Sequence, residues 1–273
     1  MKDSVATHYT HGQLLDRILS GVEAIGKTPE SVTVDDLAPV DEFHIGGRQA
    51  SEEFIVQLEL SANNHVLDVG CGIGGTSRFV ASRFGCRVTG IDLTPEFVST
   101  GQSLCDWVGL TGQVKLTQGD ATAMPFSDES FDAALMLHVG INIANKTGLF
   151  AEVYRLMKPG AVFGVYDVMQ TSDEALTYPV PWSTTPDTSA LATQGQYIEA
   201  LGQAGFDIIK IRDRREFAAE FFAKTRRRME HSGGTPPLGV HIAMGESAPV
   251  KISNMVDNIA AGRVSPVEII VVK

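Results

Sequence analysis

Short apolar runs alternate with segments of helical periodicity from residue 66 onward. Each run is short, rich in valine, isoleucine or phenylalanine, and apolar enough to be buried on both faces of a sheet. Helical patterns with one apolar side lie between them, for example at residues 76–84 and 149–157. This alternation is typical of βαβ units and predicts a mostly parallel sheet with helices on both faces. The predicted strands are residues 66–69, 87–91, 114–117, 131–137, 161–166, 206–211 and 267–272.

Two helix boundaries are marked by local chemistry. Thr94 precedes Pro95, which suits an N-cap followed by the first helical position. The helix over residues 149–157 is expected to stop at Lys158, Pro159 and Gly160, because proline and glycine disfavour its continuation.

Three segments interrupt the alternation: residues 1–60, 168–190 and 213–262. The first has a helical pattern through Leu14, Leu15, Ile18 and Val22, followed by what reads as an acidic linker at 34–42; the third has a helical pattern at 216–229 and a turn at 233–237. Ligands of open α/β sheets bind beyond the carboxyl ends of the strands, so these segments are expected to act as lids there. We therefore predict an N-terminal helical cap (1–60) and one catalytic domain (61–273) with insertions at 168–190 and 213–262.

Composition narrows the class of function. The 273 residues are 43% hydrophobic and carry a net charge of −11, which disfavours a nucleic-acid binder. No apolar stretch approaches the roughly 20 residues that span a bilayer, and no membrane partner is expected. The three cysteines form no C-x-x-C pair and no leader pattern opens the chain, so a cytoplasmic location is expected. The scattered histidines, including His8 and His11, predict no metal site. A homodimer is compatible with the sequence.

The segment H-V-L-D-V-G-C-G-I-G-G at residues 65–75 carries the strongest chemical signal. Gly70, Gly72 and Gly75 also satisfy the dinucleotide pattern G-x-G-x-x-G, with Asp92 near the position of a ribose-binding acid. Asp68 distinguishes the two cases, since a carboxylate just before the turn would repel a pyrophosphate. S-adenosylmethionine has no phosphate and carries an ammonium and a sulfonium, so the loop favours that ligand.

Four ordered motifs within residues 66–167 resemble those of class I S-adenosylmethionine-dependent methyltransferases, which implies a Rossmann-like seven-stranded fold. In that resemblance the glycine loop approaches the methionyl part while Asp68 holds the amino group. Asp92 in G-I-D-L accepts from both ribose hydroxyls, and Asp120 in G-D-A takes the adenine amino group beside Ala121 and Met124. Leu137 and His138 flank the sulfonium. The implied cofactor contacts are Asp68, Gly70, Cys71, Gly72, Gly74, Asp92, Leu93, Asp120, Ala121, Leu137 and His138.

A finer resemblance links residues 37–50, 138–144, 178–182 and 254–263 to bacterial glycine, sarcosine or dimethylglycine N-methyltransferases and their relatives. It implies that the segment at 43–47 crosses the cofactor and that Trp182 walls the acceptor pocket. Only Arg48 and Arg263 are candidates to hold a glycine-type carboxylate, so an amino-acid acceptor is not secured. The implied acceptor pocket comprises Tyr9, His44, Asn142, Tyr178, Trp182 and Arg263.

Candidate catalytic roles follow from the chemistry of an amine acceptor, which must be neutral to attack the methyl group. His138 could remove its proton directly or through water, or serve only as a shape and hydrogen-bonding element. Asp167 could steer a cationic amine or only cap a loop. Tyr9 and Tyr178 could contact a cation through their rings or only pack in the core. The basic cluster at Lys224 and 226–228 is typical of a solvated helix face, with an anion site as the alternative.

The sequence thus predicts a methyltransferase with a small-molecule acceptor, most simply an amine. O- or C-methylation of a phenol, polyketide or isoprenoid is the alternative within this class, because related sheets host all three chemistries. A nicotinamide oxidoreductase and a non-catalytic cofactor-binding protein are the alternatives outside it.

Overall fold

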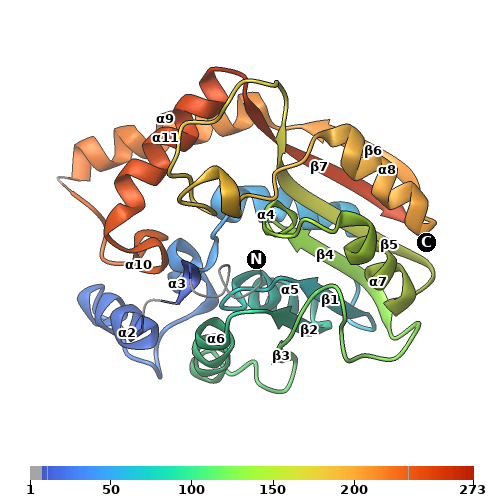
Figure 1. The fold of residues 1–273 in the computed structure, drawn as a ribbon. Coiled ribbons are helices and arrows are strands. Elements are labelled where there is room, and N and C mark those ends of the chain that lie inside the picture. The colour runs from blue at the N-terminus through green and yellow to red at the C-terminus, as the bar shows by residue number, and fades with distance from the viewer. Residues whose placement is uncertain (1–7, 11, 233) are drawn as a thin grey trace.

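The computed structural model describes residues 8–10, 12–232 and 234–273, and its centre is a seven-stranded sheet (Figure 1). The strand order is β3-β2-β1-β4-β5-β7-β6. β1 to β5 run parallel, whereas β7 is antiparallel to both β5 and β6. This confirms the predicted Rossmann-like fold. The strands are β1 (His65–Val69), β2 (Arg87–Asp92), β3 (Val114–Gln118), β4 (Phe131–Leu137), β5 (Met157–Gln170), β6 (Asp207–Asp213) and β7 (Val264–Val272).

Helices cover both faces of the sheet and bury a hydrophobic core on each. On one face α7 (Lys146–Leu156) and α8 (Gln194–Ala204) pack through residues such as Phe150 and Tyr197. On the other, α4 (Gly47–Ile55), α5 (Gly75–Phe84) and α6 (Pro95–Trp107) contribute Phe54, Phe79 and Val98. The sheet is thereby shielded from water on both sides, as a buried parallel sheet requires.

A third cluster of buried apolar residues lies among α2 (Leu14–Ala24), α3 (Val34–Asp41), α6 and α10 (His241–Met244). Residues 34–42 were expected to be an acidic linker, and that expectation is wrong. Thr33 and Asp36 form a reciprocal capping box, and Asp35 and Asp36 stand in the first turn, where the helix dipole favours acidic residues. Leu37 and Val40 give this helix its buried side.

The predicted insertions differ in structure from one another. Residues 171–193 are largely irregular, with η3 (Pro186–Thr188) as a short turn of helix. The later insertion is helical, with α9 (Arg215–Ser232), α10, η4 (Gly245–Ser247) and α11 (Ala248–Ala260). Residues 1–7, 11 and 233 belong to predicted cap and turn segments but lie outside the described residues.

Two predicted boundaries move. β5 extends from Met157, which pairs with Phe131 of β4, to Gln170, because residues 162–170 pair with β7 as far as Gln170 opposite Val264. The preceding helix, α7, accordingly ends at Leu156, before the Lys158-Pro159-Gly160 stop. α6 does begin at Pro95 after Thr94, yet the Thr94 side chain makes no capping hydrogen bond to the helix.

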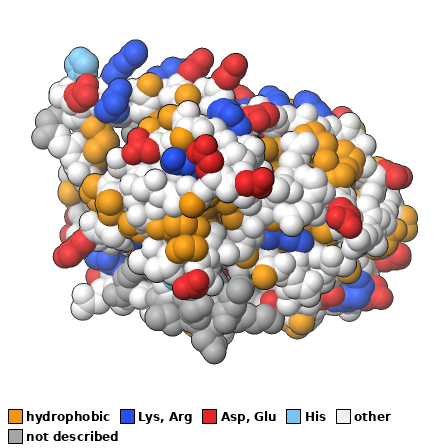
Figure 2. All heavy atoms as spheres, turned by 45° about the horizontal axis from the view of Figure 1, so that its top comes forward, with side chains coloured by type: hydrophobic (Ala, Val, Ile, Leu, Met, Phe, Trp, Pro, Cys, Tyr) orange, Lys and Arg blue, Asp and Glu red, His pale blue; other side chains and the backbone are white. Residues whose placement is uncertain are grey.

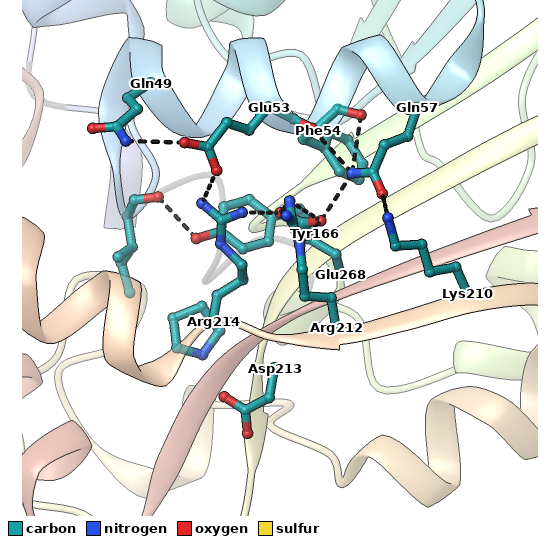
Figure 3. Close-up of polar contacts among 12 residues, drawn as sticks. Gln49, Glu53, Phe54, Gln57, Tyr166, Lys210, Arg212, Asp213, Arg214 and Glu268 are labelled. Atoms are coloured by element: carbon teal, nitrogen blue, oxygen red, sulfur yellow. Dashed lines mark hydrogen bonds and ion pairs between the residues drawn. The ribbon is translucent and has the colours of Figure 1, made fainter.

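Part of the predicted cap, α4, is fastened to the sheet by an ionic network (Figure 3). Glu268 of β7 accepts hydrogen bonds from Arg212 of β6 at 2.9 and 2.8 Å and pairs with Arg214 at 3.1 Å. Arg214 reaches Glu53 of α4 at 2.7 Å, and Gln57 of η1 (Val56–Leu58) donates to Glu268 at 3.0 Å. These contacts fix α4 in position over the sheet.

Charged side chains of both signs are interspersed on the face that carries α9, without one large basic area (Figure 2). Lys224 and residues 226–228 are exposed on α9, and Lys224 pairs with Glu220 at 3.5 Å. Within the described part of the chain, no helix is both long and apolar enough to cross a membrane.

Candidate active site

A cavity of ≈ 370 Å³ lies where β1, β2 and β4 end, the position where parallel α/β sheets place their ligands. Its floor comes from the glycine loop after β1 and from Asp92 and Leu93 after β2. Its roof comes from α3, the turn after it and Tyr9. The structure places all but one of the predicted cofactor contacts in the lining, namely Asp68, Gly70, Cys71, Gly72, Asp92, Leu93, Asp120, Ala121, Leu137 and His138.

The remaining predicted contact, Gly74, is not in the lining. It precedes α5 with φ 76°, and a side chain there would meet Leu116 of β3 at 2.7 Å. The close packing of this end of α5 against β3 therefore explains why residue 74 is a glycine.

The glycine loop is held in a fixed shape by main-chain hydrogen bonds. Gly70 and Cys71 donate from their amides to the Ile91 carbonyl at 2.8 and 3.0 Å. Gly70 (φ 70°) and Gly72 (φ 55°) have left-handed backbone conformations, and a side chain on Gly70 would overlap Val139. The loop thus exposes main chain to the cavity, as close approach of a ligand requires.

Asp68 sits beneath this loop and is 2% exposed. The Ser77 hydroxyl donates to its Oδ2 at 2.6 Å. Burial raises the pKa of Asp68 to about 7, with the neighbouring Asp92 adding to the shift against the opposing hydrogen bond from Ser77. A ligand cation such as an ammonium would favour the ionised carboxylate here.

Asp120 lies across the cavity, at the turn after β3. Its Oδ1 accepts from the Thr122 amide at 2.9 Å and from the Thr122 hydroxyl at 2.8 Å. The turn itself is joined to β2, since the Gly119 amide donates to the Asp92 carbonyl at 2.9 Å. The second and third sequence motifs are thereby brought together at one end of the cavity.

His138 closes β4 in a left-handed conformation (φ 55°), which is uncommon for a residue other than glycine. Its amide donates to the Tyr166 carbonyl at 2.7 Å. Burial, and secondarily His44, hold the pKa of His138 well below its usual value, so the ring is neutral. Its Nε2 and the Oδ1 of Asn142 are buried without a hydrogen-bond partner among the described residues. Such groups in a cavity wall are suited to a ligand.

Of the residues predicted for the acceptor pocket, Tyr9, His44 and Asn142 line the cavity. The ring of Tyr9 is tilted relative to that of Phe97, with ring centroids 5.6 Å apart. It lies edge-on to the ring of Phe43, with centroids 6.3 Å apart. These rings, with Val40 and Ala243, form an apolar and aromatic side of the cavity.

Tyr178, Trp182 and Arg263 do not line it. Trp182 is buried in a separate core with Val180 and Met255, and its Nε1 donates to Ser189 at 2.9 Å. Tyr178 packs beside that same core. Arg263 pairs with Glu174 at 3.4 Å. The structure thus places these three predicted acceptor contacts outside the cavity.

Asp167 is likewise outside the lining. It is fully buried, its Oδ2 accepts from the Tyr197 hydroxyl at 2.8 Å, and its Oδ1 accepts from the Val168 amide at 2.9 Å. Burial raises its pKa to about 6. Asp167 therefore lies inside β5 and joins this strand to α8, so it does not cap a following loop, and the geometry gives no support to the steering role.

Several lining residues were not predicted, including Val40, Asp41, Thr76, Phe97 and Ala243. Val40 and Asp41 belong to α3, the segment expected to be a linker. Their signal was the Thr33–Asp36 capping box, which marks the start of a helix with Val40 on its buried side. Ala243 comes from α10, which only the tertiary structure brings to this place.

Comparison with known proteins gives one family match and several partial relatives. Residues 66–160 match the family model of a methyltransferase domain. Sterol 4-C-methyltransferase strm-1 of Caenorhabditis elegans is 38% identical over 117 residues, which cover 43% of this chain and 35% of that protein. The match therefore spans about a third of the length of that relative.

Solved structures share the fold over more of the chain. Phosphoethanolamine N-methyltransferase 2 of Haemonchus contortus superposes with a TM-score of 0.74 at 20% identity, covering 96% of this chain and 58% of the other. Geranyl diphosphate C-methyltransferase of Streptomyces coelicolor A3(2) gives 0.70 at 15% identity, with 99% and 97% covered. The sequence match and the fold agree: residues 66–160 match a methyltransferase domain, and they lie within a Rossmann-like sheet that these solved methyltransferases share.

Proposed function

We propose that this protein transfers the methyl group of S-adenosylmethionine to a carbon atom of a small, electrically neutral acceptor that contains a carbon–carbon double bond. The sequence-based first choice was an amine. The curated relatives that match the domain include sterol and isoprenoid carbon methyltransferases, which supports the alternative chemistry instead.

The donor half of the cavity fits S-adenosylmethionine. Glycine main chain faces the cavity beside the buried Asp68, whose environment favours a cationic partner. Asp92 and Asp120 stand farther along the strand ends, where carboxylate oxygens, which only accept hydrogen bonds, suit ribose hydroxyls and an adenine amino group. When bound, the donor supplies a sulfonium-activated methyl group; the protein's part is to hold it against the acceptor and to exclude water.

The proposal of an electrically neutral acceptor rests on the charges of the residues that line the cavity. Asp41, Asp68, Asp92 and Asp120 line the cavity, and among its described lining residues there is neither lysine nor arginine. Arg48 and Arg263, the candidates for a carboxylate, pair with Glu42 at 3.0 Å and Glu174 at 3.4 Å. A phosphate or carboxylate would lack a counter-charge here, whereas a neutral molecule would not.

The apolar side of the cavity fits the same acceptor. Methylation of a double bond produces a carbocation, which aromatic ring faces and nearby carboxylates stabilise. Tyr9, Phe43 and Phe97 supply three rings, and the ring of Tyr9 contacts each of the other two. The side chain of Asn142 interacts with the Tyr9 hydroxyl and so helps to place the first of these rings.

N-methylation of a neutral amine is the second candidate. The acidic lining would attract the protonated form of such a substrate, and the neutral ring of His138 could accept a proton from it. A glycine-type acceptor is disfavoured within this candidate, because its carboxylate would meet no cation.

The test is release of S-adenosylhomocysteine by the purified full chain, with product masses recorded. Geraniol and geranyl diphosphate form a matched pair, since they share the double bonds and differ in charge; dimethylglycine and a neutral tertiary amine form a second pair. We expect turnover with geraniol or another neutral alkene and a product heavier by one methylene. Turnover confined to the diphosphate or to the amines would overturn the carbon proposal.

A further inference from the structure

A chain of buried polar groups runs from the cavity wall into the protein interior. His44 lines the cavity, and its Nε2 lies 3.0 Å from the Ser51 Oγ. The Ser51 hydroxyl in turn donates to Glu42 Oε2 at 2.6 Å. Ser51 is fully buried and Glu42 is 4% exposed, so water does not interrupt these contacts.

Ser51 has one hydroxyl proton, which determines the direction of the hydrogen bonds that join Glu42, Ser51 and His44. When Ser51 donates to an ionised Glu42, its oxygen must accept from His44, which places the imidazole proton on Nε2. Nδ1 is then the ring nitrogen with a free lone pair. When Glu42 is protonated the order reverses, and His44 carries its proton on Nδ1. The protonation state of Glu42 therefore decides whether His44 presents a base or a donor.

We propose that His44, Ser51 and Glu42 form a proton relay that removes the proton released when the acceptor is methylated. This rests on the proposed function. The sulfur–methyl bond breaks, a carbon–carbon bond forms, and the resulting carbocation loses a proton from an adjacent carbon, whose C–H electron pair becomes the new double bond. The proton passes to His44 Nδ1, the Nε2 proton to Ser51, and the Ser51 proton to Glu42, which later releases it to solvent.

The environment gives the relay a direction. Burial, followed by the charge of Arg48, lowers the pKa of His44 to about 4. Burial raises the pKa of Glu42 to about 7 against the opposing effects of Arg48 and Ser51. A proton arriving at His44 is consequently more stable on Glu42. His138, with ring centroid 5.9 Å from that of His44, is also a buried neutral ring and does not compete as a resting place for the proton.

The charged groups around Glu42 come from four elements. Arg48 of α4 contacts Glu42 Oε1 at 3.0 Å, and Arg78 of α5 and Asp41 of α3 act on it with opposite signs. Asp68 of β1 is close enough to be affected by its charge. Arg78 and Asp41 are paired with each other at 2.5 Å. The pair holds the end of α3 that precedes Glu42.

Neighbouring contacts hold the three relay residues in position relative to one another. The Tyr166 hydroxyl donates to the Ile45 carbonyl at 3.0 Å and so fixes the turn that carries His44. Ser51 is on α4, which the network of Glu53, Arg214 and Glu268 fastens to the sheet (Figure 3). His44 is the group that would touch the acceptor, whereas Ser51 and Glu42 are positioning residues that act through it.

The first experiment reads the His44 tautomer and needs no acceptor. Two-bond nitrogen–proton NMR correlations of the full chain labelled with ¹⁵N-histidine are recorded from pH 5.5 to 8.5, with His44→Gln to assign the signals. We expect His44 to be the Nε2–H tautomer at pH 8 and to shift toward Nδ1–H as the pH falls through about 7. In Glu42→Gln this pH dependence should be absent, whereas the exposed neighbour change Glu52→Gln should retain it. If the His44 tautomer changes neither with pH nor in the Glu42→Gln variant, the relay is overturned.

The second experiment measures turnover with the acceptor identified in the screen. Glu42→Gln and Ser51→Ala should each lower kcat at least tenfold with little change in donor affinity, and Glu42→Gln should abolish the rise of kcat with pH around 7. Ser51→Thr, which keeps the hydroxyl, should recover part of the loss. Unchanged kcat in both first variants overturns the relay while leaving methyl transfer intact. If no acceptor is methylated the proposed function fails, and the tautomer measurement still decides whether the relay exists.

Discussion

The Gly72 amide donates a hydrogen bond of 2.9 Å to Asp92 Oδ2, so the first and second sequence motifs are directly joined. Asp92 Oδ1 accepts from the Thr94 amide at 2.8 Å in the same way. Each carboxylate oxygen has a second lone pair, which leaves capacity for ribose hydroxyls. Asp92 thus shapes the glycine loop as well as facing the cavity.

Asp92→Ala should therefore weaken S-adenosylmethionine binding by at least tenfold. The change removes the ribose acceptor and leaves the Gly72 amide without its partner, at about 1–3 kcal/mol for such a group. Calorimetric titration of the full chain measures the effect. The exposed Asp106→Ala on α6 serves as the control and should bind like the unaltered protein. Equal affinity of the two variants would refute the ribose assignment.

Asp68→Asn should abolish the pH dependence of donor binding. In the unaltered protein the pKa of Asp68 is about 7, and the donor's ammonium favours the ionised form. Below that pH binding must displace a proton, so affinity should fall by about tenfold per pH unit. Asparagine retains an oxygen that can accept from Ser77, yet it has no charge, and its weak binding should be flat from pH 6 to 8. Parallel pH profiles for the two proteins would contradict the assignment.

The same substitution should stabilise the ligand-free protein at pH 8. Burial raises the pKa of Asp68 from 3.8 to about 7, so between these values the native state holds a proton that the unfolded state has released. Stability consequently falls as the pH rises through this window, and the full cost is present above 7. Removing the carboxylate removes that cost. Thermal unfolding at pH 5 and pH 8 should show a larger gain in Tm for Asp68→Asn at pH 8.

His138→Asn should lower turnover at least tenfold while leaving donor affinity nearly unchanged. Asparagine tolerates the left-handed backbone (φ 55°) at this position, so the fold should survive, whereas the imidazole with its buried, unpartnered Nε2 is lost. Steady-state kinetics and calorimetry separate the two effects. Turnover like that of the unaltered protein would leave His138 with only a shape role.

The predictable part of the site is the part encoded locally. Asp68 and Asp92 lie at the carboxyl ends of their strands and Asp120 and His138 just beyond theirs, and parallel strands bring these ends to one edge of the sheet. Alternating apolar runs therefore located both the sheet and most of the donor half of the cavity. The same reasoning could not find Ala243, because its helix joins the lining only through packing with α2 and α3.

The errors have specific physical causes. The acidic residues at 35, 36, 41 and 42 led to the prediction of a linker at 34–42. The capping box that starts at Thr33 indicates the helix that is found there. Trp182 and Tyr178 were assigned to the acceptor because residues 178–182 resemble the segment that walls the pocket in N-methyltransferases. They instead complete a separate core with Met255 of α11, and the sequence holds no local signal for that partner.

Gly75 is the first residue of α5, and α3 of the cap packs against it, so substitution of Gly75 tests this contact. A Cβ at Gly75 would lie 2.5 Å from both the Cβ and the carbonyl oxygen of Asp41, and the Asp41 main chain is held by the buried pair with Arg78. Gly75→Ala should therefore destabilise the fold by about 1–3 kcal/mol, as overpacking does. Gly202→Ala in α8 meets nothing within 4 Å and should stabilise the fold by about 0.4–1 kcal/mol. Urea unfolding of both variants measures the difference. Equal stabilities would mean that α3 can move away from α5 at no cost, and with it the wall that carries Val40, Asp41 and the start of the relay.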